Sequence, residues 1–156
     1  MKAFNSPWNT DPATILGAWA MLDGLFGREF NANATASQTP TITAATIVAG
    51  IIQFTGAPAG GVTATTDTAG NLIAAAAGAF PGGLISRGGI IPIGWATTVR
   101  IMNSSGQVVT WTAGAGVLVT GTATVANGSW RDFQMIVTNI GALAAVTFQN
   151  MGGGTV

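Results

Sequence analysis

Residues 107–128, QVVTWTAGAGVLVTGTATVANG, form a 22-residue stretch without one charged side chain, and this stretch constrains the fold more than any other. Threonine alternates with apolar residues along much of it, and glycine interrupts the pattern at positions 114, 116 and 121. A membrane-spanning helix needs about 20 mostly apolar residues in a row, which this pattern does not supply. Short alternating runs bounded by glycine are typical of half-buried β-strands. We therefore expect hairpin structure in which threonine replaces charge on the outward face.

The rest of the chain is also poor in charge. Its 156 residues include five basic and five acidic side chains, so the formal net charge is zero. Charged residues make up 6% of the chain, against about 25% in an ordinary soluble domain. A free monomer with a net charge near zero is prone to association, and strand edges without charge attract other strand edges. We expect an obligate oligomer or a component of a larger assembly, since the chain has no lysine after Lys2 to protect such edges.

The absence of two residue types excludes several kinds of catalytic and metal site. The chain has no histidine and no cysteine, which excludes disulfides, cysteine nucleophiles, triads with a histidine base and the usual zinc sites. The run from Asp67 to Gly70 is faintly similar to the Asp-Thr-Gly motif of aspartic proteases, but a helix cap before the following alanine run explains it better. We expect no enzymatic activity, and no catalytic residue, metal site, cofactor or small-molecule substrate.

Nucleic-acid and membrane partners are not expected either. The four arginines are scattered along the chain and form no basic patch in the sequence, which binding to phosphate backbones requires. The most apolar run, Ile42–Phe54, is only 13 residues long and contains polar residues and a glycine. The N-terminal sequence MKAFNSPWNTD is too polar to begin a secretory signal.

The first 40 residues differ in composition from the rest. Residues 1–10 are expected to form an extended arm, and Asp11 is a good N-cap for a helix over residues 12–25. Residues 27–40, GREFNANATASQTP, are expected to be a polar linker that ends in proline. We therefore divide the chain into an N-terminal part, 1–40, and a β-rich domain, 41–156.

The β-rich domain has short strand patterns that alternate with turn signals. Within it, a cap at Asp67 or Thr68 and a run of alanines predict one helix over residues 69–79. The whole pattern predicts a mainly β fold, an antiparallel sandwich or small barrel, with this short helix inserted and with the N-terminal arm and helix added. Strand patterns occur at 41–54 (one or two strands), 62–66, 95–103, 108–112, 117–119, 122–125, 130–139 and 144–150.

Six residues are candidates for binding a partner. Four large aromatic residues, Phe4, Trp8, Trp19 and Phe26, cluster ahead of the β-rich domain. They belong either to a docking segment that is buried on a partner or to a segment that folds back on its own core. The other two candidates are Trp130 and Arg131 at the start of a predicted strand. Arg131 and the adjacent Asp132 face opposite sides of that strand, so they do not form one site within it. We expect them to contact neighbours across the sheet or across a subunit interface, with ligand recognition as the alternative.

The segment from about residue 41 to 151 resembles β-rich surface proteins of tailed bacteriophages. The residues that carry the resemblance are TITAATIVAGIIQFTG, TATTDTAGNLIAAAAGAF, VRIMNSS, VTWTAGAGVLVTGTATVANGSWRDFQMIVTNI and VTFQNM, in this order. They look like head decoration, or cement, proteins, and similar modules occur in tail fibres and spikes. Residues 1–40 carry no comparable resemblance.

The resemblance implies a non-enzymatic virion protein on the outer surface of the capsid, made in the host cytoplasm. Such a protein is a homotrimer at threefold or quasi-threefold positions, bound to the major capsid protein, and it holds capsomers together against genome pressure. The β-rich domain is then expected to form the trimer, with Phe4, Trp8 and Trp19 anchoring the arm or helix on the shell. A trimeric receptor-binding module of a tail fibre or spike is the alternative.

Overall fold

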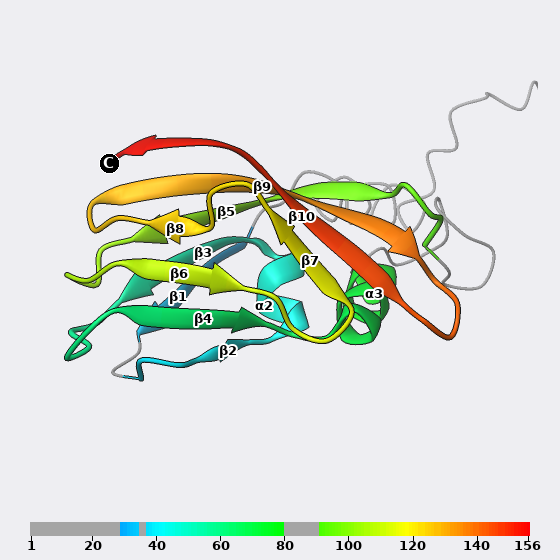
Figure 1. The fold of residues 1–156 in the computed structure, drawn as a ribbon, viewed down its shortest axis with the longest axis horizontal. Coiled ribbons are helices and arrows are strands. Elements are labelled where there is room, and N and C mark those ends of the chain that lie inside the picture. Colours follow the sequence, from blue (N-terminus) through cyan, green and yellow to red (C-terminus); the bar gives the residue numbers. More distant parts are fainter. Residues whose placement is uncertain (1–28, 35–36, 80–90) are drawn as a thin grey trace, which may run out of the picture.

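The structure is a computed structural model, and it describes residues 29–34, 37–79 and 91–156. Two β-sheets and two helices make up this part of the chain (Figure 1). Neither sheet closes into a barrel among the described residues, so the expected mainly β, two-sheet fold is confirmed. The expected arm over residues 1–10 and helix over 12–25 lie outside the described residues.

The larger sheet, here called sheet A, has six strands, and the smaller, sheet B, has four. Sheet A has the order β1 (Glu29–Ala34), β3 (Gly50–Thr55), β5 (Ala96–Asn103), β9 (Ser129–Asn139), β10 (Ala145–Thr155) and β7 (Val117–Thr120). Sheet B has the order β2 (Thr41–Ile42), β4 (Val62–Thr66), β6 (Val109–Thr112) and β8 (Thr124–Val125).

The chain winds between the two sheets in successive coils. In each coil one strand of sheet A is followed by one strand of sheet B: β1 and β2, then β3 and β4, then β5 and β6. Helix α2 (Ala44–Val48) follows the first coil and helix α3 (Ala69–Gly78) follows the second, and both lie at the same end of the sheets (Figure 1). Each coil therefore places its strands beside, and parallel to, the corresponding strands of the coil before it.

The strand directions differ from the expected antiparallel arrangement. The pairs β5–β9, β9–β10 and β6–β8 are antiparallel, as expected, but the other five pairs among the described residues are parallel. Apart from β9 and β10, two strands joined by a short turn do not pair here, because the turn carries the chain to the other sheet. For the same reason β7 does not form a hairpin with β6; it crosses to sheet A and pairs with β10.

Local sequence explains where the helices begin. Thr68 is the N-cap of α3 and its side chain accepts a hydrogen bond from the amide of Asn71, which confirms the predicted helix and its cap. Helix α2 was not expected, because its residues Thr46, Ile47 and Val48 favour strands. The side chain of Thr43 caps α2 by accepting from the amide of Thr46, and such a cap overrides the weak strand preference of a five-residue segment.

Strand β1 lies within the stretch expected to be a linker. Residues 29–34 pair with β3 over the whole length of both strands, from Glu29 opposite Gly50 to Ala34 opposite Thr55. The expectation of a linker is therefore wrong for these residues, whose asparagines and glutamate gave no strand signal. Strand β1 therefore belongs to the β-rich body.

The core lies between the two sheets and the helices. Alternate residues of β3, β4, β5, β6 and β9 point into it. The indole of Trp111 occupies its centre, with ring centroids 5.9 Å from Phe148 and 6.4 Å from Phe133. Other fully buried residues are Ile42, Ile47, Ile52, Phe54, Val62, Leu72, Val99, Ile101 and Met135.

Candidate partner-binding surfaces

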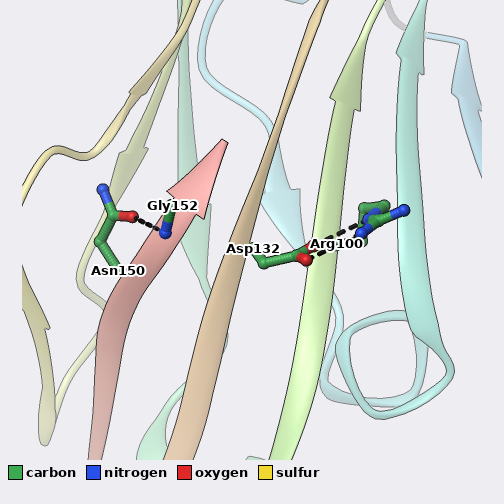
Figure 2. A network of polar contacts seen from close by, with 4 residues as sticks. All are labelled: Arg100, Asp132, Asn150 and Gly152. Carbon is green, nitrogen blue, oxygen red and sulfur yellow. Dashed lines mark hydrogen bonds and ion pairs between the residues drawn. The ribbon is translucent and has the colours of Figure 1, made fainter. Parts of the chain in front are cut away.

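The outer face of sheet A carries an ion pair between two neighbouring strands. Arg100 on β5 lies directly opposite Asp132 on β9, and its Nε and Nη2 atoms donate to the two carboxylate oxygens over 2.8 Å each (Figure 2). This two-bond geometry fixes the planar guanidinium group, and the bond to Asp132 raises the pKa of Arg100. The side chains remain 38% and 21% exposed, so the pair itself adds little to stability.

Trp130 completes this group. The guanidinium carbon of Arg100 lies 4.3 Å from the centroid of the indole ring, within the range of a cation–π contact. The ring also lies against Gly154 on β10, where a Cβ atom would be 3.1 Å from the indole Nε1. Glycine at this position lets the large ring lie close to the sheet. Trp130, Arg100 and Asp132 thus form one ordered, partly exposed cluster, which we call the Trp130 cluster.

Arg131 points to the opposite side of β9 from Trp130. Its cross-strand partner is the buried Ile101, and its Nε atom donates to the carbonyl of Thr124 over 2.9 Å. The structure therefore does not bring the two predicted binding residues together. Trp130 belongs to the surface of sheet A, whereas Arg131 links β9 to β8 across the gap between the sheets.

A bulge in β10 shapes the strand beside the Trp130 cluster. The register with β9 shifts between Asn150 and Gly152, and Gly152 has a positive φ of 131°. The side chain of Asn150 stabilises this bulge: it accepts from the Gly152 amide over 2.7 Å (Figure 2) and donates to the Thr122 carbonyl over 2.7 Å. Met151, the extra residue of the bulge, is 59% exposed, which places an apolar side chain at the edge of sheet A.

Exposed apolar residues also gather where β9 turns into β10, at the right of Figure 1. Leu143 is 83% exposed and Ile140 is 38% exposed in this turn. Ile93, at 62%, precedes Gly94, whose amide donates to the carbonyl of Val137 near the end of β9. Exposed apolar groups that cluster in this way indicate a contact with another molecule.

Asp67 lies at a corner of the second coil and has no catalytic partner there among the described residues. One carboxylate oxygen accepts from the Thr68 amide and the Asn71 side chain, and the other accepts from the amide of Ala44 at the start of α2. These bonds lower the pKa of Asp67, with the Asn71 bond contributing most. The carboxylate therefore serves both helix N-termini, in agreement with its interpretation as a cap.

Sequence reasoning predicted that Asp132 contacts a neighbour across the sheet or across a subunit interface, and in the structure it lies opposite Arg100 on β5. Sequence reasoning did not single out Arg100, because the pairing of β5 with β9 was not predicted. The remaining candidates, Phe4, Trp8, Trp19 and Phe26, lie outside the described residues. Within the described part, no three His, Cys, Asp or Glu side chains group where they could hold a metal ion, and no helix there is long and apolar enough to span a membrane.

Comparison with known proteins adds no assignment. No protein-family model matches the chain, and neither a curated protein nor a solved structure matches it.

Proposed function

We propose that this protein is a non-enzymatic structural protein of a phage virion, a decoration protein that binds the major capsid protein as a homotrimer and stabilises the head. The observation that carries the proposal is the absence of charge along three edge strands. Strands β2, β7 and β8 end their sheets, and none of them contains a charged residue. Monomeric proteins usually protect such edges with lysine, proline or a covering segment.

Uncharged edges favour association with further chains. An open edge strand offers backbone amides and carbonyls to a strand or loop of a neighbouring molecule. Strands β2 and β7 are such edges, whereas the Thr124 carbonyl of β8 already accepts from Arg131. The apolar turn around Leu143 and the exposed Met151 supply side chains that lose contact with water in such an interface. These features support a trimer formed by the β-rich body.

Attachment to the shell is assigned to the N-terminal part. Phe4 and Trp8 are the proposed anchors, since large aromatic side chains dominate the energy of many interfaces. A trimer would present three such segments to the shell at once, so modest affinity per segment would give strong attachment overall. The resemblance to decoration proteins described from the sequence agrees with this arrangement.

The first experiment measures the mass of the purified protein by light scattering, for the full chain and for a variant that begins at Glu29. The structure sets this start point, because β1 pairs with β3 and belongs to the body. We expect a trimer in both cases, with circular dichroism verifying that the shorter chain is folded. A monomer in both cases would contradict the proposed trimer.

A second experiment tests the site of attachment. Deletion of residues 1–10 is expected to abolish binding to shells of the major capsid protein and to leave the trimer intact. Unchanged binding would contradict the assigned role of Phe4 and Trp8. The number of copies in a virion separates the proposal from the tail-fibre alternative, since a decoration protein is present in hundreds of copies and a fibre tip in far fewer.

A further inference from the structure

The outward face of sheet B carries only threonine. In β4 and β6 the residues that point away from the core are Thr63, Thr65, Thr110 and Thr112, while the residues between them are buried. The strand register aligns these threonines with those of β2 and β8. One row runs Thr63, Thr110, Thr124, and a second row runs Thr41, Thr65, Thr112.

Backbone hydrogen bonds extend each row by one threonine. The amides of Thr63 and Thr65 donate to the carbonyls of Gln38 and Pro40, so the strand pairing continues before β2 and places Thr39 opposite Thr63. Pro40 has no amide to donate, which explains why β2 itself begins only at the next residue.

At the other edge, the amide of Trp111 donates to the carbonyl of Ala123, which continues the pairing of β6 and β8 and places Thr122 opposite Thr112. The pattern Thr-x-Thr therefore occurs on four adjacent strands, and the face carries two rows of four threonines. We call these eight residues the threonine face. They are Thr39, Thr41, Thr63, Thr65, Thr110, Thr112, Thr122 and Thr124.

The spacing of this array follows from sheet geometry. Adjacent strands lie about 4.8 Å apart, and residues two apart in a strand are separated by roughly 6.6 Å. Branching at Cβ restricts each threonine to few rotamers. Hydrogen bonds fix the middle of the face further: the hydroxyls of Thr65 and Thr112 lie 3.0 Å apart, and Thr112 also donates to the carbonyl of Ala64 over 3.2 Å. The eight side chains thus start from regularly spaced backbone positions, and the hydroxyls of the central pair, Thr65 and Thr112, are held toward each other.

The charge and the area of the threonine face limit the kinds of partner that it can bind. None of the eight residues is charged, so the face fits a neutral partner that both donates and accepts hydrogen bonds. The array spans roughly 15 Å by 7 Å at these spacings, on the order of 100 Å². A stable protein interface buries about 800 Å² on each partner, so this face alone is too small to hold a second copy of the chain.

We propose that the threonine face binds the surface of ice. Water molecules in hexagonal ice form a neutral lattice that donates and accepts hydrogen bonds, and its oxygen atoms repeat at two distances close to the strand spacing and the two-residue spacing of the face. Threonine side chains that start from these spacings contact the lattice: their hydroxyls bond to its waters, while the methyl groups hold further waters in an ice-like order. This activity is independent of the proposed attachment to a capsid.

The test uses the full chain and ice itself as the probe. Growth of ice grains is followed by microscopy in a sucrose solution held a few degrees below freezing, and the freezing-point depression of a single crystal is measured in parallel. Thr63→Lys and Thr124→Lys each place a charged chain on the face. The matched control is Thr138→Lys, because Thr138 is an exposed strand residue at the end of β9 in sheet A.

We expect the unchanged protein and Thr138→Lys to stop the growth of ice grains, and both face variants to lose most of this activity while they keep the unfolding midpoint of the unchanged protein. Thr65→Val, which keeps the shape of the side chain and removes its hydroxyl, is expected to reduce the activity. Absence of activity in the unchanged protein would overturn the proposal, as would equal activity in all variants. Binding to an insoluble neutral polysaccharide without any effect on ice would also overturn it.

Discussion

At the scale of single residues, one carboxylate connects two coils of the chain. Asp67 follows the sheet B strand of the second coil, yet one of its oxygens accepts from Ala44 in the first coil, over 3.0 Å. The other oxygen serves the start of α3 through Thr68 and Asn71. Because both helix N-termini carry partial positive charge, a single negative group in this position stabilises the stacking of the coils as well as each helix.

Replacement of Asp67 by alanine is expected to lower the free energy of unfolding by about 1 kcal/mol at neutral pH, the usual value of a helix cap. The pKa of Asp67 in the folded protein lies below its ordinary value of 3.8. The contribution of Asp67 to the free energy of unfolding is therefore complete above pH 3.8. It is lost as the pH falls through the lower pKa of the folded protein. Urea unfolding from pH 7 to 2 measures this. The Asp67→Asn variant should show a smaller loss of stability below pH 4, and an equal loss would contradict the assignment.

The buried indole of Trp111 gives a second prediction at this scale. Its Nε1 atom is buried and has no hydrogen-bond partner in the structure, and an unsatisfied buried donor costs about 1–3 kcal/mol. Replacement by phenylalanine removes this donor but leaves a small cavity, so we expect the unfolding free energy to change by less than about 1 kcal/mol. Replacement by alanine should cost about 3–5 kcal/mol. Urea unfolding distinguishes these values, and similar large losses in both variants would show that the Nε1 group is satisfied.

At the scale of elements, the sequence predicts most of the strands, but it misses β1 and helix α2 and does not predict how the strands pair. Apolar residues alternate with Arg100 in the predicted strand 95–103, and the burial of β5 follows this alternation. Helix α3 was predicted from the local cap and the run of alanines. Pairing between coils depends on contacts between segments far apart in the chain, and no local signal reports them. The parallel pairs, the crossing of β7 to sheet A and the contact of Arg100 with Asp132 all belong to this long-range information.

Two glycines, Gly114 and Gly70, differ in whether the structure leaves room for a side chain at their position. At Gly114, an added Cβ atom would meet the backbone carbonyl oxygens of Thr66 and Asp67, neither of which moves without displacing β4. At Gly70, in the first turn of α3, an added Cβ atom meets nothing within 4 Å. We expect Gly114→Ala to destabilise the protein by about 1–3 kcal/mol and Gly70→Ala to stabilise it by about 0.4–1 kcal/mol. Thermal unfolding of both variants measures the difference, and the opposite order would contradict the described corner.

At the scale of the whole molecule, stability rests on apolar packing rather than on charge. The chain has five basic and five acidic side chains, and among the described residues the ion pair of Arg100 and Asp132 is partly exposed to solvent. Salt screens such pairs effectively, since the Debye length falls to about 3 Å at 1 M. The folded state of each molecule therefore depends little on ionic strength.

The thermal unfolding midpoint is expected to shift by no more than about 3 °C between 10 mM and 500 mM sodium chloride, which is roughly the effect of losing 1 kcal/mol in a domain of this size. Calorimetry at a fixed protein concentration measures it. Arg100→Lys, which loses the two-bond geometry and the planar contact with Trp130, should lower the midpoint similarly at both salt concentrations. A strong fall of the midpoint with salt would show that charge holds the fold together.

The position of β10 in the sequence determines when the protein can complete its folding during translation. This strand joins β9 to β7 and brings Phe148 against Trp111, yet it is translated after every other described element. The first coils can stack as they leave the ribosome. Until β10 has also left the exit tunnel, β7 has no strand to pair with and Trp111 has no contact with Phe148. Folding is therefore completed only after synthesis of this segment, and nascent chains on one messenger RNA expose uncharged strands to each other until that moment.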